Sequence, residues 1–149
     1  MTFKHRIYLA SSGRNPKHEE ALSLLRSAGC DVYDWKHPKP GLAGFSLSEV
    51  DPNWESWTPE EFLKSWSHFA LQRQFDCGKE ALRACEACVL LLPCGASAYL
   101  EAGYCIGRGK PVLIVLSEHN FRPELMYRLA SYVVADLKDM TRALEFLLK

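Results

Sequence analysis

The chain has 149 residues, of which 48% are hydrophobic and 24% are charged, as expected for one ordinary globular domain. Its 18 basic residues balance its 18 acidic ones, which excludes the strongly basic surface that binds nucleic acids and anionic membranes. It has no apolar run of about 18 residues, and its first apolar stretch is too short for a secretory signal. We therefore expect a cytoplasmic protein, with no nucleic-acid or membrane partner, whose six cysteines are thiols.

The first part of the chain predicts two strands with a helix between them. Residues 7–10 are uniformly apolar, as in a strand covered on both faces, and residues 30–35 alternate as a second strand. Asn15 and Pro16 predict a helix cap followed by a first-turn proline, and Gly29 predicts the end of that helix.

A long insert at about residues 36–58 then interrupts this pattern. It is rich in proline and glycine, and long loops in small domains tend to be lids or binding loops. Thr58 and Glu61 have the spacing of a capping box, which predicts a helix from residue 58 to about 85, with a break near Gly78.

The remaining residues predict three more strands and further helices. The strands cover residues 87–92, 111–116 and 132–135. Helices are expected after the small-residue loop at 93–97, at 123–129, and after Asp136 as far as the last residue.

Strands that alternate with helices are typical of a parallel sheet. We predict one domain, residues 1–149, with an α/β flavodoxin-like (Rossmann-like) three-layer sandwich and a five-stranded parallel sheet in the order 2-1-3-4-5. In such a sheet, ligands bind beyond the carboxyl ends of strands one and three, where the strand order reverses. The segments at that place, residues 10–15 and 93–101, are rich in small residues that let a ligand approach the backbone.

Glu101 is the acidic residue expected at this crevice, in the first turns of the helix after the third strand. The positive end of the helix favours the ionised form, so we expect a carboxylate at neutral pH. An ionised carboxylate that faces a sugar carbon is what covalent glycosyl transfer requires. The alternative is a glutamate that only complements the helix dipole.

Several segments of the chain, taken together in their order and spacing, resemble the nucleoside 2-deoxyribosyltransferase superfamily over about residues 6–127. They are the first strand and turn at 7–12, Asp76 on a helix, the apolar stretch at 85–92, the loop and helix start at 93–104 with its Glu-Ala-Gly-Tyr sequence, and Gly109-Lys110-Pro111. The resemblance implies cleavage of the N-glycosidic bond of a (deoxy)nucleoside or its 5′-monophosphate, by hydrolysis or by transfer to another base.

The resemblance also implies roles for individual residues. Glu101 falls on the catalytic nucleophile, and Asp76 on the aspartate that orients the sugar or assists the departing base. Tyr8 falls near an aromatic residue that positions the nucleophile. Met126 lies in a segment that closes the pocket from a neighbouring subunit, which implies a homo-oligomer (a dimer or higher), although the family has asparagine where Glu124 stands.

The first loop resembles the Ser-x-Arg turn with which the nucleotide N-hydrolase branch of this superfamily holds a 5′-phosphate. Hydroxyl groups, backbone N–H groups and a guanidinium group suit a phosphate dianion, whereas the alternative is an ordinary exposed turn before the helix. The candidate substrate-binding residues of the two crevice loops are Ser11, Ser12, Gly13, Arg14, Gly95 and Ser97.

Phe45, Trp54 and Trp57 of the insert are candidates for stacking on the nucleobase, with core packing or a dimer contact as the alternative. The five histidines are scattered, and we assign them no role. We expect no cofactor and no metal, because Cys85 and Cys88 have no second Cys or His pair at zinc-ligand spacing.

Two other functions fit the same pattern. An NAD-cleaving domain of the Toll/interleukin-receptor type has a similar fold and also places a glutamate after a serine-containing loop, as in residues 97–101. A nucleotide-binding module without enzymatic activity would bind the same small molecules without turnover. Release of the free base from NAD or from nucleotides separates these possibilities.

Overall fold

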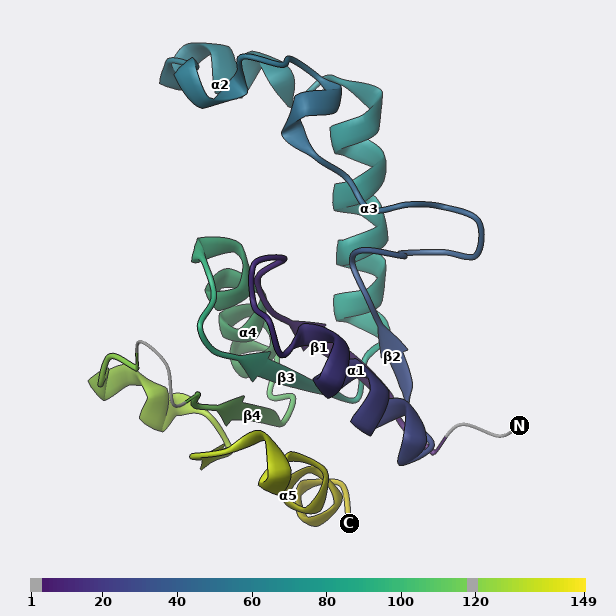
Figure 1. The fold of residues 1–149 in the computed structure, drawn as a ribbon, viewed down its shortest axis with the longest axis vertical. Coiled ribbons are helices and arrows are strands. Elements are labelled where there is room, and N and C mark those ends of the chain that lie inside the picture. Colours follow the sequence, from purple (N-terminus) through teal and green to yellow (C-terminus); the bar gives the residue numbers. More distant parts are fainter. Residues whose placement is uncertain (1–3, 118–120) are drawn as a thin grey trace. The chain divides into compact units, whose positions relative to one another are not determined.

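The computed structural model describes residues 4–117 and 121–149, which form two compact units (Figure 1). Unit 1 contains the described residues up to Tyr33 and those from Ala84 onward, and unit 2 contains Asp34–Arg83.

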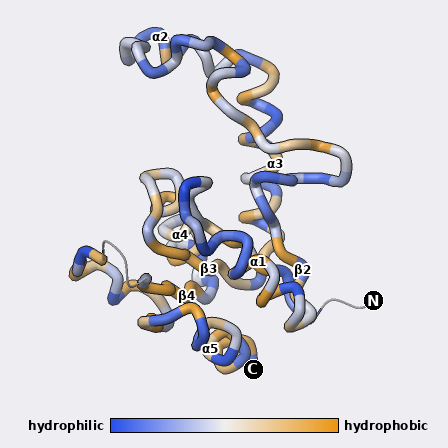
Figure 2. Tube along the Cα trace, viewed as in Figure 1, coloured by the Kyte–Doolittle hydropathy of each residue, from blue (hydrophilic) through white to orange (hydrophobic). Residues whose placement is uncertain are grey.

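Unit 1 is built on a five-stranded parallel sheet. Its strands are β1 (Arg6–Ala10), β2 (Asp31–Tyr33), β3 (Ala87–Leu91), β4 (Val112–Val115) and β5 (Tyr132–Val134). They are arranged in the order β2-β1-β3-β4-β5, which confirms the predicted sheet. The central strands β3 and β4 are hydrophobic along their length (Figure 2), because helices cover both faces of the sheet.

The side chains of β1 alternate between the two covered faces of the sheet. Ile7 and Leu9 lie in the main core, which also contains side chains of α1 (His18–Ser27) and α5 (Met140–Leu147). Tyr8 points to the opposite face, where it contacts α4 (Ala96–Gly107). Unit 1 therefore has the three layers expected from the sequence.

The first helix begins later than predicted. Asn15 and Pro16 lie in the preceding turn, and Lys17 occupies the cap position of α1. The Asn15 side-chain oxygen accepts from Lys17 N (2.9 Å), so it closes the turn before the helix, while its amide group donates to the neighbouring loop after β3. The predicted end is confirmed, since Gly29 has a φ of 82°, a conformation that favours glycine.

Unit 2 contains η1 (Leu47–Glu49), η2 (Trp54–Ser56), α2 (Pro59–Ser65) and α3 (Phe69–Ala84). The capping box is confirmed, with the Thr58 hydroxyl 3.2 Å from Glu61 N and the Glu61 carboxylate 2.7 Å from Thr58 N. The predicted break near Gly78 was wrong, because the helix is interrupted between α2 and α3 instead. There, His68 Nδ1 accepts a hydrogen bond from Ala70 N (3.2 Å) and so starts a new helix, whereas Gly78 lies inside α3.

The last part of unit 1 contains two short 3₁₀ helices, η3 (Leu125–Leu129) and η4 (Leu137–Asp139). Asp136 caps η4 rather than the final α-helix, since its carboxylate accepts from Lys138 N at 3.1 Å. Within the described ranges, no helix combines the length and apolar character needed to cross a membrane.

Candidate functional site

The loops that follow β1 and β3 meet at the carboxyl edge of the sheet, because Ala10 is paired with Leu90. Asn15 joins these loops: its side-chain amide donates to the carbonyl oxygen of Pro93 (3.2 Å), and its side-chain oxygen accepts from Lys17 N (2.9 Å). This buried residue thus holds the first loop against the segment that leads into α4. The sequence analysis treated it only as a helix cap.

Tyr8 and Glu101 are brought together between β1 and α4. Tyr8 is only 3% exposed, and its hydroxyl group donates a hydrogen bond to the carboxylate of Glu101. Glu101 itself is half-buried. A nucleophile candidate and a donor that fixes its orientation therefore lie beside β1, one of the two strands between which the strand order reverses.

The protonation state of Glu101 differs from the expected carboxylate. Burial raises the pKa of Glu101 to about 7, although the hydrogen bond from Tyr8 acts in the opposite direction. The pKa is higher than expected from the sequence because burial favours the neutral acid, and Glu101 is in the second turn of α4, beyond the first turn where the helix dipole acts. Burial, followed by the charge of Glu101, raises the pKa of Tyr8 far above its usual value, so this phenol remains a donor.

The first loop forms a compact turn in which Ser12 Oγ accepts from Arg14 N (3.2 Å). Gly13 and Arg14 are exposed. The Ser11 hydroxyl is hydrogen-bonded to Nδ1 of His18, which is fully buried at the start of α1. The sequence analysis gave the histidines no role, because a contact between a loop and the next helix has no recognisable spacing.

The second loop leads directly into α4. Gly95 is the cap residue and has no side chain with which to bond the first backbone N–H groups of the helix, and Ser97 is exposed in the first turn. A Cβ atom placed on Gly95 would meet no described atom within 4 Å, so there is open space beside this backbone. Free N–H groups at a helix start are suited to an anion.

Cys94 and two tyrosines form a cluster that the sequence did not reveal. The Cys94 thiol is hydrogen-bonded to Tyr99, and the hydroxyl groups of Tyr99 and Tyr127 are 2.9 Å apart. Burial raises the pKa of Cys94 to about 11, so it is a neutral thiol at physiological pH. The tyrosine pair joins α4 to η3, on which Met126 is exposed.

The other predicted site residues belong to unit 2. Asp76, on α3, accepts a hydrogen bond from Gln72 Nε2 (3.0 Å) and lies 4.0 Å from Lys79 Nζ. Trp57 donates its indole N–H to Asp51 (2.8 Å), which fixes the ring within the insert. Phe45 and Trp54 are half-buried there.

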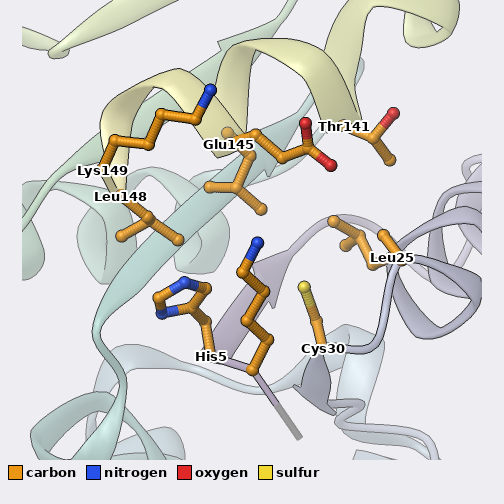
Figure 3. Close-up of a pocket in the computed structure, with 10 residues that line it drawn as sticks. His5, Leu25, Cys30, Thr141, Glu145, Leu148 and Lys149 are labelled. Carbon is orange, nitrogen blue, oxygen red and sulfur yellow. The ribbon is translucent and has the colours of Figure 1, made fainter.

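A cavity of about 50 Å³ lies at the opposite end of the sheet, before the amino ends of β1 and β2 (Figure 3). His5, Cys30 and Glu145 are among the residues that line it. Pockets for small organic ligands usually have volumes of about 300–1,000 Å³, so this cavity is too small for a nucleotide.

None of the six cysteines, all of which the structure describes, forms a disulfide. In the described ranges 4–117 and 121–149, no cluster of three or more His, Cys, Asp or Glu side chains is arranged to hold a metal ion.

Solved structures of low sequence identity share this fold. The CMP N-glycosidase BcmB of Clostridium botulinum is 15% identical, with 94% of this chain and 98% of that chain covered and a TM-score of 0.53. A conserved protein of Enterococcus faecalis V583 is 15% identical, with 95% and 97% covered and a TM-score of 0.60. The 2-deoxyribosyltransferase of Bacillus psychrosaccharolyticus is 22% identical, with 91% and 89% covered and a TM-score of 0.55.

No protein-family model and no curated protein sequence matches the chain. The structural likenesses show that the chain shares its fold with an N-glycosidase and a 2-deoxyribosyltransferase.

Glu101→Gln is expected to stabilise the folded chain at pH 8 and to change its stability little at pH 4. In the folded state the pKa of Glu101 lies above its ordinary value of 4.5. The protonated side chain therefore stabilises the folded chain fully below pH 4.5, and this stabilisation is lost as the pH rises through about 7. Because glutamine stays neutral, the expected gain at pH 8 is about 1–3 kcal/mol in the free energy of unfolding. Denaturant titrations at the two pH values measure it. Equal or lower stability of the variant at pH 8 would contradict a buried, proton-binding carboxyl group.

Proposed function

We propose that this protein is an enzyme that cleaves the N-glycosidic bond of a nucleoside or nucleoside 5′-monophosphate. The observation that carries the proposal is the Tyr8–Glu101 pair, a half-buried carboxyl group on α4 held by a buried phenol of β1, below the loops that meet at the carboxyl edge of the sheet. The fold is shared with a CMP N-glycosidase and a 2-deoxyribosyltransferase, which supports this class of reaction.

In the first step, a carboxylate oxygen of Glu101 forms a bond to the anomeric carbon of the sugar. The bond from that carbon to the base breaks, and its electron pair leaves with the base, which takes up a proton. Tyr8 holds the carboxylate by its hydrogen bond. Asp76 is proposed to orient the sugar or to help protonate the base.

In the second step, water attacks the anomeric carbon, the carboxylate of Glu101 leaves, and the proton of the water passes to solvent. A nitrogen of another base in place of water would give transfer instead of hydrolysis. A carboxyl group whose pKa is about 7 has its ionised, nucleophilic form available near neutral pH, as this cycle requires.

The 5′-phosphate is proposed to lie between the two crevice loops. Ser12 and Arg14 would contact it from the first loop, and the uncapped start of α4 after Gly95 would contact it from the second. Asn15 supports this arrangement because it joins the two loops. Ser11, Gly13 and Ser97 are further proposed contacts, and Phe45, Trp54 and Trp57 are proposed to stack on the base.

We also propose that the protein is a homo-oligomer. Large apolar side chains are exposed on α4 and η3, namely Leu100, Leu125, Met126 and Leu129. A second copy that covers this surface would place Met126 at a subunit contact near the substrate. Sedimentation velocity measures the oligomeric state.

Glu101→Gln is expected to abolish release of the free base while substrate binding remains measurable. Loss of a covalent nucleophile raises the barrier by at least about 4 kcal/mol, which is roughly a thousandfold in rate. Chromatography of the base released from cytidine, deoxycytidine, CMP and NAD measures turnover, and calorimetry measures binding. Near-native base release by this variant would remove Glu101 from the mechanism, and release only from NAD would favour an NAD-cleaving enzyme.

A matched pair of variants on α3 serves as the control. Asp76→Asn is expected to lower the rate by a smaller factor, on the order of tenfold, because orientation is its proposed role. Glu80→Gln removes an exposed carboxylate from the same helix, which pairs with Lys39 of the insert (3.5 Å), and it should leave the rate unchanged. If Asp76→Asn changes only thermal stability, Asp76 has a structural role.

Arg14→Ala is expected to remove the preference for a phosphorylated substrate. One charge-assisted contact of this kind contributes about 1.5–3 kcal/mol, so the unmodified enzyme should prefer a nucleoside monophosphate by about ten- to a hundredfold in kcat/KM. The variant should keep its activity on the unphosphorylated nucleoside, and Lys17→Ala, which removes a neighbouring cation, should keep the preference. Equal rates on both substrates in the unmodified protein would refute the phosphate site.

A further inference from the structure

We propose that Tyr33 is a positioning residue of the candidate active site, which holds the ring of Tyr8 so that its hydroxyl group points at Glu101. The catalytic consequence rests on the proposed function, whereas the positioning itself is a property of the ligand-free protein. The sequence analysis gave Tyr33 no role.

The contact follows from the register of the sheet. Tyr8 on β1 is paired with Tyr33 on β2, and register partners on neighbouring strands point to the same face. The two rings are stacked, with their centroids 5.0 Å apart and an angle of 22° between their planes. Such a stacked pair stabilises the two rings beyond the area that they bury, and it therefore favours one side-chain conformation of Tyr8.

The other neighbour of Tyr8 in the sheet gives much less support. On β3 its register partner is Cys88, a buried residue with a short side chain. A thiol cannot cover the face of a phenol ring. Tyr33 therefore provides the flat contact surface that fixes the ring of Tyr8 on one side, while α4 presents Glu101 to its hydroxyl group.

Hydrogen bonds weaken steeply when the donor is misdirected, so the effect of Tyr8 on Glu101 depends on where its ring lies. Without the ring of Tyr33, Tyr8 can turn toward the vacated space, and Glu101 loses its donor for part of the time. Because that hydrogen bond lowers the pKa of Glu101, its loss would raise the pKa further.

Several other titratable groups surround this pair. Cys88 on β3 interacts with Tyr8, and Cys94 in the loop before α4 interacts with Glu101. Cys94 remains a neutral thiol near pH 7, since burial raises its pKa to about 11. A shift in the pKa of Glu101 after substitution of Tyr33 would therefore indicate that the hydrogen bond from Tyr8 has been weakened.

The test compares Tyr33→Leu, which removes the ring, with Tyr33→Phe, which keeps it. The readout is the titration of the Glu101 side-chain carboxyl carbon in the ligand-free protein, followed by ¹³C NMR and assigned with Glu101→Gln. Tyr33→Leu is expected to move the midpoint upward by about 0.5–1 pH unit, a partial loss of one hydrogen bond to a charged group. Tyr33→Phe is expected to keep the original midpoint.

A second comparison isolates Tyr8 as the intermediary. In a Tyr8→Phe background, whose own midpoint is raised, Tyr33→Leu should cause no further shift. An unchanged midpoint in Tyr33→Leu, or an equal shift with and without the Tyr8 hydroxyl, would overturn the proposal. If Tyr33→Leu does not fold, Tyr33→Met replaces it, because methionine also lacks a ring but its longer, flexible side chain adapts better to the vacated space.

Kinetics separates this inference from the proposed function. If the protein releases a base, Tyr33→Leu should lower kcat about two- to fivefold at pH 7 with little change in KM, and the acid limb of its pH profile should move by the same amount as the NMR midpoint. If the NMR midpoint moves but no variant or parent protein releases a base, the proposed function fails and the positioning role stands. If activity is present but the midpoint does not move, the positioning role fails.

Discussion

The hydrogen bond from Tyr8 to Glu101 crosses the packed boundary between β1 and α4, and it forms only if both elements keep their positions. Tyr8 is held by a strand in the interior of the sheet, between β2 and β3. Glu101 is presented from the second turn of a helix whose preceding loop is tied to the first loop by Asn15. Strand order, loop contacts and helix position all determine this one contact.

Two effects with opposite signs act on the pKa of Glu101 at this contact. Burial favours the neutral acid, whereas the phenol donor favours the carboxylate, and the balance gives a pKa of about 7. A more exposed glutamate would be ionised at neutral pH but strongly hydrated, and a more deeply buried one would remain protonated. The folded state loses some stability as the pH rises from about 4.5 to about 7 as a result, which is common at sites that keep reactive groups partly desolvated.

The fold could be predicted because it depends on local signals. Uniformly apolar strands alternate with helices, and this pattern also located Glu101 at the correct edge of the sheet. The contacts of Asn15 and His18 could not be predicted, because they join side chains to partners that are set by tertiary packing. The raised pKa of Glu101 could not be predicted for the same reason. The position of Glu101 in its helix can be read from the sequence, but its burial cannot. The helix break at residues 66–68 could not be predicted either, because the helix that follows it is capped by His68, and histidine is not one of the common cap residues.

The central claim is that Glu101 forms a covalent bond to the sugar during turnover. Rapid mixing with a substrate that releases its base, followed by acid quenching and mass spectrometry of the digested protein, tests it most directly. The account predicts a peptide containing Glu101 that is heavier by one pentosyl group (or its 5′-phosphate), formed before steady state and absent in Glu101→Gln. Base release at the full rate with no adduct on Glu101, or an adduct that persists in the glutamine variant, would contradict it.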